Sequence, residues 1–238
     1  MAPPNRRAQR RTDALTRDRI VEAAVDLLDE AGERGLTFRA LTERLATGPG
    51  AIYWHVPNKD ELLAAATDAV IAEALAAGPH SDAPRSDAPR EEVRALSLGL
   101  FAAINRHPWL AGNLAAQLAR GASAGAAPRI FESLGRRVRA LGVPAEGWFV
   151  ATSALVHYVL GAAGQNAANA ATARSLGSDV DRSGFLESTA AAWEGLDPED
   201  FPVVRSMAGQ LRDHDDREQF LGGVDLVLAG ITATYAAG

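Results

Sequence analysis

Apolar residues recur at helical spacing near the start of the chain. Between Ile20 and Ala31 they fall three or four positions apart, which is typical of a helix with one buried face. Thr16 is a suitable N-cap ahead of this pattern, and Gly32 is a suitable end. The pattern therefore predicts a first helix between these two residues.

Two shorter helices are predicted to follow. A second apolar pattern lies behind another N-cap residue, Thr37, and indicates a helix of about nine residues that stops before Gly48. Pro49 suits the first position of a third helix, where its missing N–H would have no partner in any case. This third helix carries a Tyr-Trp-His run and ends at Pro57.

A fourth helix and a loop are predicted next. Asn58 and Glu61 have the spacing of a capping box and open an alanine-rich helix that runs to Gly78. Residues 78–90 then repeat Ser-Asp-Ala-Pro-Arg in tandem and offer little apolar surface to bury. We interpret this segment as a mobile loop or linker.

The rest of the chain also has helical periodicity, and no stretch alternates convincingly with a period of two. We therefore predict an all-α protein with a small N-terminal bundle and a larger second one. The polar segment 171–184 is expected to be a second mobile loop. The further helices are predicted at about 91–106, 108–119, 127–141, 144–170, 185–194, 199–213 and 216–235.

Composition narrows the class of protein. The 238 residues are 47% hydrophobic and include no cysteine, which suits a reducing interior, so we expect a cytoplasmic protein. The charge-free run Gly147 to Ala173 contains several polar residues and is too interrupted to predict a membrane span, and no secretory signal is expected. The net charge is −6, so any surface for nucleic acid must be local. Arginines are concentrated in residues 1–15, which we interpret as a flexible basic arm or a solubilising tail.

Three short helices with a tight turn before the third have the dimensions of a helix-turn-helix domain, in which the third helix enters the DNA major groove. On spacing alone, an ordinary three-helix bundle with Tyr53 and Trp54 in its core remains an alternative.

Two motifs make the first interpretation specific. The segment GLTFRALTERLATGPGAIYWHVPNKDELL resembles the DNA-binding signature of the tetracycline-repressor (TetR) family. SALVHYVLG and EQFLGGVDLVLAGI resemble the two C-terminal helices through which the family's tetracycline-responsive members dimerise. The resemblance implies a DNA-binding domain at 16–62 and a ligand-binding and dimerisation domain at 63–238.

The resemblance implies a DNA-contacting surface that can be compared with side-chain chemistry. Ile52 and Val56 are expected to pack inward, while the ring cluster Tyr53, Trp54 and His55 turns toward DNA. Arg39 is the expected base reader, because a guanidinium can grip a guanine with two hydrogen bonds, and Lys59 lies at an expected phosphate site. The complete expected set is Thr37, Arg39, Thr47, Pro49, Gly50, Ala51, Tyr53, Trp54, His55 and Lys59.

The chain departs from the family pattern at two positions. Ala46 occupies a turn position where glycine is usual, and Thr42 replaces a usual alanine. If Ala46 adopts a left-handed conformation, the turn is strained by about 1 kcal/mol. These departures put the angle of the third helix in doubt.

The second domain is expected to dimerise and to bind a ligand. The uncharged helix from Gly147 to about Ala170 should be buried on all sides, with the last helix as its neighbour, in a two-fold four-helix bundle. Such a dimer would read a palindromic DNA operator. The expected interface residues are Phe220, Leu221, Val224, Val227, Leu228 and Ile231.

Polar residues among apolar ones suggest an apolar pocket with a few orienting groups, although for each residue a satisfied core position is the alternative. In the tetracycline-responsive relatives, the counterpart of Gln165 is a glutamate and a metal-binding histidine falls near Leu114. We therefore expect no metal or cofactor, and an apolar or aromatic small-molecule effector. The expected pocket residues are Asn105, His107, Trp109, Asn113, Gln117, Trp148, His157 and Gln165.

The expected function is a homodimeric transcriptional repressor that leaves its operator when an effector binds. An enzyme is not expected, because the chain has no Ser-His-Asp order, H-E-x-x-H, phosphate loop or dinucleotide glycine motif. The remaining alternative is a helical small-molecule carrier or interaction protein with impaired DNA binding.

Overall fold

A computed structural model describes residues 15–76, 88–121, 125–175 and 182–235, and every regular element within these ranges is helical. The all-α prediction is therefore confirmed for this part of the chain. Residues 1–14 of the basic arm and 78–87 of the predicted loop lie outside the described residues. The prediction of a loop is wrong at 88–90, because a helix already starts at Ala88. Two compact units make up the chain, one from Met1–Glu73 with Gly112–Pro128 and the other from Ala74–Ala111 with Arg129–Gly238. The predicted functional boundary at residue 62 stays a prediction.

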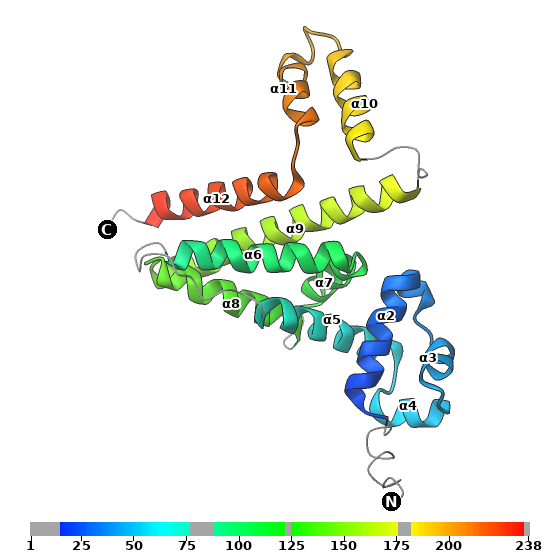
Figure 1. Cartoon of the computed structure of the whole chain (residues 1–238). Coiled ribbons are helices and arrows are strands. Elements are labelled where there is room, and N and C mark those ends of the chain that lie inside the picture. Colours follow the sequence, from blue (N-terminus) through cyan, green and yellow to red (C-terminus); the bar gives the residue numbers. More distant parts are fainter. Residues whose placement is uncertain (1–14, 77–87, 122–124, 176–181, 236–238) are drawn as a thin grey trace, which may run out of the picture. The chain divides into compact units, whose positions relative to one another are not determined.

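The first unit begins with the three predicted helices, which are α2 (Arg17–Gly35), α3 (Phe38–Leu45) and α4 (Pro49–His55) (Figure 1). Both predicted N-caps are present. The Thr16 hydroxyl accepts from the Arg19 amide at 3.2 Å, and the Thr37 hydroxyl accepts from the Ala40 amide at 3.1 Å. These bonds satisfy N–H groups that a helix start leaves unpaired.

Helix α2 runs past its predicted end. Gly32 has φ 63° and interrupts the regular helix where the sequence predicts a stop, but another turn continues to Gly35. Arg44 of α3 forms ion pairs with Glu30 and Asp26 of α2, and its hydrogen bond to Glu30 raises the pKa of Arg44. Arg44 thus joins two helices within the unit.

Helix α5 (Lys59–Ala76) opens on the predicted capping pair. The Glu61 amide donates to the Asn58 side chain at 2.8 Å, and the Asn58 side chain donates to the Glu61 carboxylate at 3.2 Å. The remaining helices are α6 (Ala88–Arg106), α7 (Trp109–Ala119), α8 (Ala126–Ala140), the short 3-10 helix η1 (Ala145–Gly147), α9 (Trp148–Ser175), α10 (Arg182–Glu194), α11 (Pro202–Arg212) and α12 (Asp216–Tyr235). The prediction of a loop over 171–184 is wrong at its ends, because α9 continues to Ser175 and α10 starts at Arg182.

In the second unit, α9 packs against both α6 and α12 (Figure 1). A Cβ on Gly223 would meet the Tyr158 ring, and a Cβ on Gly147 would meet the Tyr235 ring. Gly223 of α12 therefore makes room for a ring of α9, and Gly147 of η1, directly before α9, makes room for a ring of α12. These two contacts also show that α9 and α12 run antiparallel.

The long apolar helix α9 is only partly enclosed by its own chain. By length and composition the segment Ala145–Thr172 could cross a membrane, a test that core helices of soluble proteins also pass. Only 39% of its most apolar window is buried within the single chain, so burial on every side would require the second chain of the expected dimer and stays a prediction. The exposed side needs a partner or water.

Helices α10 and α11 pack against each other and are joined by charged side chains. Arg212 of α11 contacts Glu194 at 2.6 Å and Glu187 at 2.9 Å, both on α10. The hydrogen bond from Arg212 lowers the pKa of Glu194. The pairing therefore persists above the ordinary pKa of a glutamate and weakens as the pH falls through the lowered value.

The turn between α3 and α4 depends on Ala46, which has φ 48° and ψ 46°. Among the described residues it is the only one besides glycine with a positive φ. The expected left-handed alanine is therefore present. Its amide donates toward the Glu43 carbonyl, and the Thr47 amide donates to the Thr42 carbonyl at 3.1 Å, so the end of α3 is capped despite the alanine.

We expect Ala46→Gly to stabilise this turn by about 0.5–1 kcal/mol, because glycine removes the clash of Cβ in the left-handed region, partly offset by its freer unfolded chain. Hydrogen–deuterium exchange of peptides that cover α3 and α4 in the full chain measures this. Ala40→Gly, at a regular helical position of α3 within the same peptides, is the control and should destabilise by at least that amount. Faster exchange in the Ala46 variant would contradict the argument.

Candidate nucleic-acid interface and effector domain

The inner side of α4 anchors the helix. Ile52 and Val56 are both buried, as predicted, and the Val56 amide donates to the Ile52 carbonyl at 2.9 Å to close the last turn. Gly48 precedes the helix and Pro49 occupies its first turn, also as predicted. Because a helix of this length is unstable alone in water, these two buried side chains hold it in place.

The outer side of α4 presents the ring cluster. The Trp54 side chain is 85% exposed and Tyr53 is 49% exposed, while His55 is half-buried. The Tyr53 ring stacks on Phe38 of α3 with centroids 4.4 Å apart and planes 12° apart. The alternative in which Tyr53 and Trp54 fill the core is therefore excluded, and their contact with DNA stays a prediction.

The start of α4 is open. Pro49, Gly50 and Ala51 are all exposed, and a Cβ added to Gly48 or Gly50 would meet no atom within 4 Å. No described side chain of this protein covers the backbone at Gly48 or Gly50. A nucleic acid could therefore approach the backbone of α4 closely, although these three residues offer no polar side chain that reads a base.

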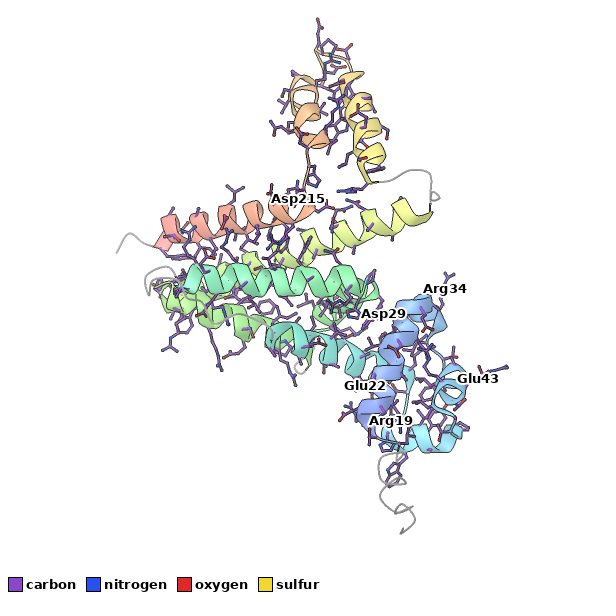
Figure 2. All side chains as sticks on the ribbon, in the orientation of Figure 1. Arg19, Glu22, Asp29, Arg34, Glu43 and Asp215 are labelled. Carbon is purple, nitrogen blue, oxygen red and sulfur yellow. The ribbon has the colours of Figure 1, made fainter. Side chains whose placement is uncertain are left out.

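Arg39 lies on α3 with a side chain that is 88% exposed, and its Nε is 3.0 Å from the Glu43 carboxylate. Figure 2 labels Glu43, the acidic member of this pair. An exposed pair of this kind contributes little stability, so Arg39 can exchange Glu43 for another acceptor at low cost. The two threonines of the expected set have backbone roles as well, Thr37 as the cap of α3 and Thr47 in the turn.

Lys59 has a structural partner that the sequence did not indicate. Its Nζ donates to the Glu33 carbonyl at 2.6 Å, which satisfies a backbone acceptor near the end of α2. An ammonium group has three donors, so two remain for a phosphate. The proposed phosphate contact is thus compatible with the bond to Glu33.

The expected pocket residues are divided between the two units. Asn113 and Gln117 are buried in the first unit, and the carbonyl oxygen of Gln117 has no hydrogen-bond partner among the described residues. In the second unit, Asn105 lies 2.8 Å from Asn166, and Gln165 donates to Asn169 at 2.8 Å. Within the described ranges no group of three or more histidines and carboxylates could hold a metal ion.

Two of the expected pocket residues are open to solvent in the single chain, and their ligand role stays a prediction. Trp148 donates its indole N–H to the Val143 carbonyl at 2.7 Å, and the guanidinium of Arg139 lies 5.6 Å from its ring. His157 is exposed on α9. Neither side chain is enclosed within its own chain. His107 and Trp109 lie edge to face, with ring centroids 6.0 Å apart.

The expected interface face on α12 also needs correction. Phe220, Val224, Leu228 and Ile231 are buried within their own chain, and Leu221 and Val227 are half-buried. Buried side chains cannot form the outer surface that meets a second chain. The apolar side chains turned to solvent are instead Leu226 on α12, which is 76% exposed, and Phe149 and Val150 on α9.

Taken together, the packed three-helix unit and the exposed ring cluster on its third helix define a helix-turn-helix DNA-binding protein with a larger helical second unit. Residues 20–66 match the model of bacterial regulatory proteins of the tetR family, and residues 83–235 match the tetracyclin repressor-like C-terminal domain. The chain belongs to the TetR family of transcriptional regulators.

Solved structures agree with this assignment. A TetR transcriptional regulator from Streptomyces coelicolor, SCO7222, is 59% identical, with 92% of this chain and 98% of that chain covered and a TM-score of 0.82. ActR from the same organism, in complex with (S)-DNPA, is 25% identical over 93% and 99% of the two chains, with a TM-score of 0.67. BioQ with its double-stranded DNA operator is 33% identical over 66% and 88%, with a TM-score of 0.51.

We expect Trp54→Ala to weaken operator binding by at least about tenfold while the unfolding free energy changes by less than about 0.5 kcal/mol, because this residue is 85% exposed. Fluorescence anisotropy at fixed salt and thermal unfolding measure the two quantities. Phe201→Ala, which removes another exposed aromatic on the chain, is the control. Wild-type operator affinity in the Trp54 variant would exclude this face from the interface.

We expect Glu43→Gln to strengthen binding to DNA of any sequence several-fold at low salt, because it removes a carboxylate and frees Arg39 for phosphate. The measurement is anisotropy on a random duplex over a range of salt concentrations. Glu22→Gln on α2 (Figure 2) is a matched control, since it removes the same charge at an exposed residue for which the described part of the chain provides no arginine partner. Equal gains in the two variants would mean that only net charge matters.

Proposed function

We propose that this protein is a homodimeric transcriptional repressor that binds a palindromic DNA operator and leaves it when a small-molecule effector binds the second unit. The observation that carries the proposal is the exposed ring cluster on a short, well-anchored third helix of a helix-turn-helix unit. We assign the DNA contacts to this helix, to Arg39 and Thr37 on α3, and to Thr47 and Lys59 beside it.

Dimer formation is supported by the outer surface of α9 and α12. Phe149, Val150 and Leu226 expose large apolar side chains there, and a Cβ on Gly161, Gly222 or Gly230 would meet no atom within 4 Å of its own chain. Glycines without an intrachain reason, beside exposed apolar residues, suit the close approach of a partner's helices. A two-fold dimer would repeat α4 and read two half-sites about 34–36 Å or a multiple apart.

Effector response is supported by the family assignment and by polar residues inside the second unit. An effector that changes operator affinity must have its own affinity changed by DNA to the same extent, typically by about 1–3 kcal/mol. We place the protein in the cytoplasm, where a chain without cysteine encounters DNA in a reducing interior. We propose no catalytic activity, since the known motifs of nucleophilic and metal-dependent enzymes are missing from the sequence.

The test is to select operator sequences from a random duplex pool with the full-length protein and then measure affinity against salt. The proposal expects a palindrome, a specific affinity at least about a thousandfold above the non-specific affinity, and a steep salt slope. Weak binding without a preferred sequence would instead favour the alternative function, a small-molecule carrier or interaction protein with impaired DNA binding. The departures from the family pattern at Ala46 and Thr42 support that alternative.

We expect Leu226→Glu to convert the dimer to a monomer and to reduce operator affinity by at least about a hundredfold, because a buried unpaired carboxylate would be required in the dimer. Sedimentation velocity and anisotropy are the measurements. Val203→Glu, at an exposed apolar position on α11, is the control and should remain dimeric. A Leu226 variant that stays dimeric would place the interface elsewhere.

A further inference from the structure

A cavity of about 130 Å³ lies in the second unit, between α9, α12 and one residue of α6. Its apolar floor is aromatic. The Phe220 ring stacks on Phe101 with centroids 4.4 Å apart, and Tyr158 lies beside it at 5.9 Å. The Tyr158 hydroxyl donates to the Phe220 carbonyl at 3.0 Å, which fixes the position of the Tyr158 ring. We call this space the α9–α12 cavity.

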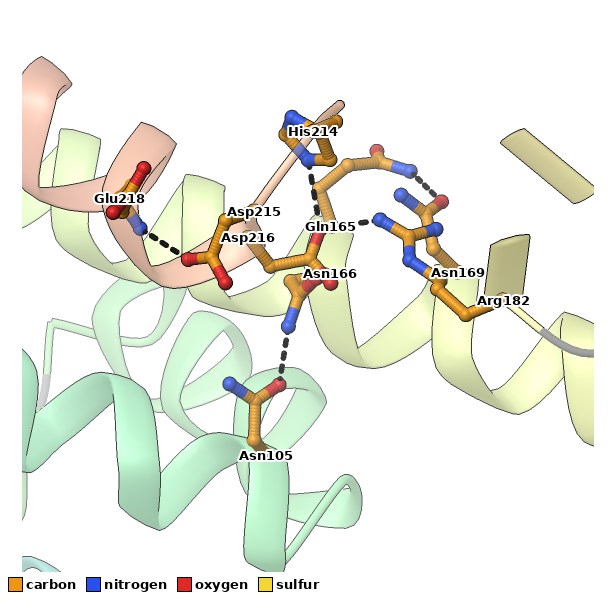
Figure 3. Close-up of polar contacts among 9 residues, drawn as sticks. All are labelled: Asn105, Gln165, Asn166, Asn169, Arg182, His214, Asp215, Asp216 and Glu218. Carbon is orange, nitrogen blue, oxygen red and sulfur yellow. Dashed lines mark hydrogen bonds and ion pairs between the residues drawn. The ribbon is translucent and has the colours of Figure 1, made fainter. Parts of the chain in front are cut away.

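One rim of the α9–α12 cavity carries a carboxylate with unequal partners (Figure 3). Oδ1 of Asp216 accepts a hydrogen bond from Arg182 and lies 2.8 Å from the His214 ring nitrogen. Oδ2 accepts no bond from a described residue as the side chains lie. If the Asn166 amide is turned over, its nitrogen is 3.1 Å from Oδ2, and a second acceptor position on that oxygen still remains.

The other rim carries two amides from successive turns of α9. Gln165 donates to Asn169, which leaves the Gln165 carbonyl oxygen and the Asn169 amide nitrogen without partners among the described side chains (Figure 3). The cavity is therefore bordered by aromatic rings, with a carboxylate acceptor on one side and, from the two exposed amides, one donor and one acceptor on the other.

Size limits the ligand. An apolar cavity of about 150 Å³ is known to hold one benzene molecule, so about 130 Å³ suits a single ring or the terminal ring of a larger compound. Charge limits it further, because the carboxylate of Asp216 is already paired with Arg182. A neutral ring with a hydrogen-bond donor matches the free acceptor position better than an ion does.

We propose that the α9–α12 cavity binds a single aromatic ring bearing a hydroxyl or amino group, with the ring on Phe220 and the donor on Asp216. The inference deepens the proposed function, and rests on it, only where it treats this ligand as an effector. Arg182 starts α10 and Asp216 starts α12, so a ligand that donates to the free Oδ2 of Asp216 binds directly beside the ion pair that joins these helices.

The probe is phenol, with toluene as a ring of similar size that lacks the donor, titrated into full-length protein without DNA and followed by ligand-observed NMR. The wild type should bind phenol saturably below about 10 mM and prefer it to toluene by about fivefold, the effect of one hydrogen bond. In Asp216→Asn the preference should fall below about twofold, since the amide replaces the charged acceptor.

Ala162→Leu tests the location, because Ala162 lines the cavity and a larger side chain would occupy it. Phenol affinity should fall by at least about tenfold, whereas Ala168→Leu, exposed on the same helix, should change it less than about twofold. In the wild type, phenol protons should give nuclear Overhauser contacts to the Phe220 and Tyr158 rings, which locates the ligand even if the leucine variant does not fold.

Two results would overturn the site: no saturable phenol binding, or binding without contacts to these rings. Operator affinity is measured separately with phenol present. Phenol bound on Phe220 with operator affinity unchanged supports the site and contradicts only the effector role, so the two proposals fail independently.

Discussion

The burial of Ile52 and Val56 is the interaction on which the proposed DNA-binding surface depends. Helix α4 has only seven residues, which is too short to persist by backbone hydrogen bonds alone. Two buried aliphatic side chains, four positions apart, fix its rotation about its own axis. Once that rotation is fixed, Tyr53 and Trp54 must lie on the outer side of α4. The presentation of the ring cluster is thus a consequence of what lies beneath it.

In the second unit too, the packing of buried side chains determines which side chains are left on the surface. Helix α12 lies close to α9 and to the residue before it where Gly223 and Gly147 leave room for tyrosine rings. The same packing buries Phe220, Val224, Leu228 and Ile231. The side chains that remain outside include polar ones as well as glycine, alanine and a few large apolar residues such as Leu226. The same packing also lines the α9–α12 cavity with aromatic rings, so one helix pair carries both the proposed interface and the proposed ligand site.

Features that depend on neighbouring residues could be predicted from the sequence, whereas contacts between residues far apart in the chain could not. The caps at Thr16 and Thr37, the start at Pro49 and the inward pair in α4 all follow from neighbouring residues, and the structure has each of them. The outward face of α9 could not be predicted, because a helix without charge has no polar side to mark it. Phe220 was misassigned because periodicity shows which side of α12 is apolar but not whether that side meets its own chain or a second one. The bond from Lys59 to Glu33 spans too many residues for periodicity to reveal it.

The left-handed conformation of Ala46 has a consequence for the orientation of α4. Glycine at position 46 would let the peptide between the two helices sample many orientations, whereas the methyl group of Ala46 confines it to a narrow basin of backbone angles. The orientation of α4 relative to α3 is then held near one value at the expense of some stability. If α4 contacts DNA as proposed, this turn favours targets that fit the helix in that orientation.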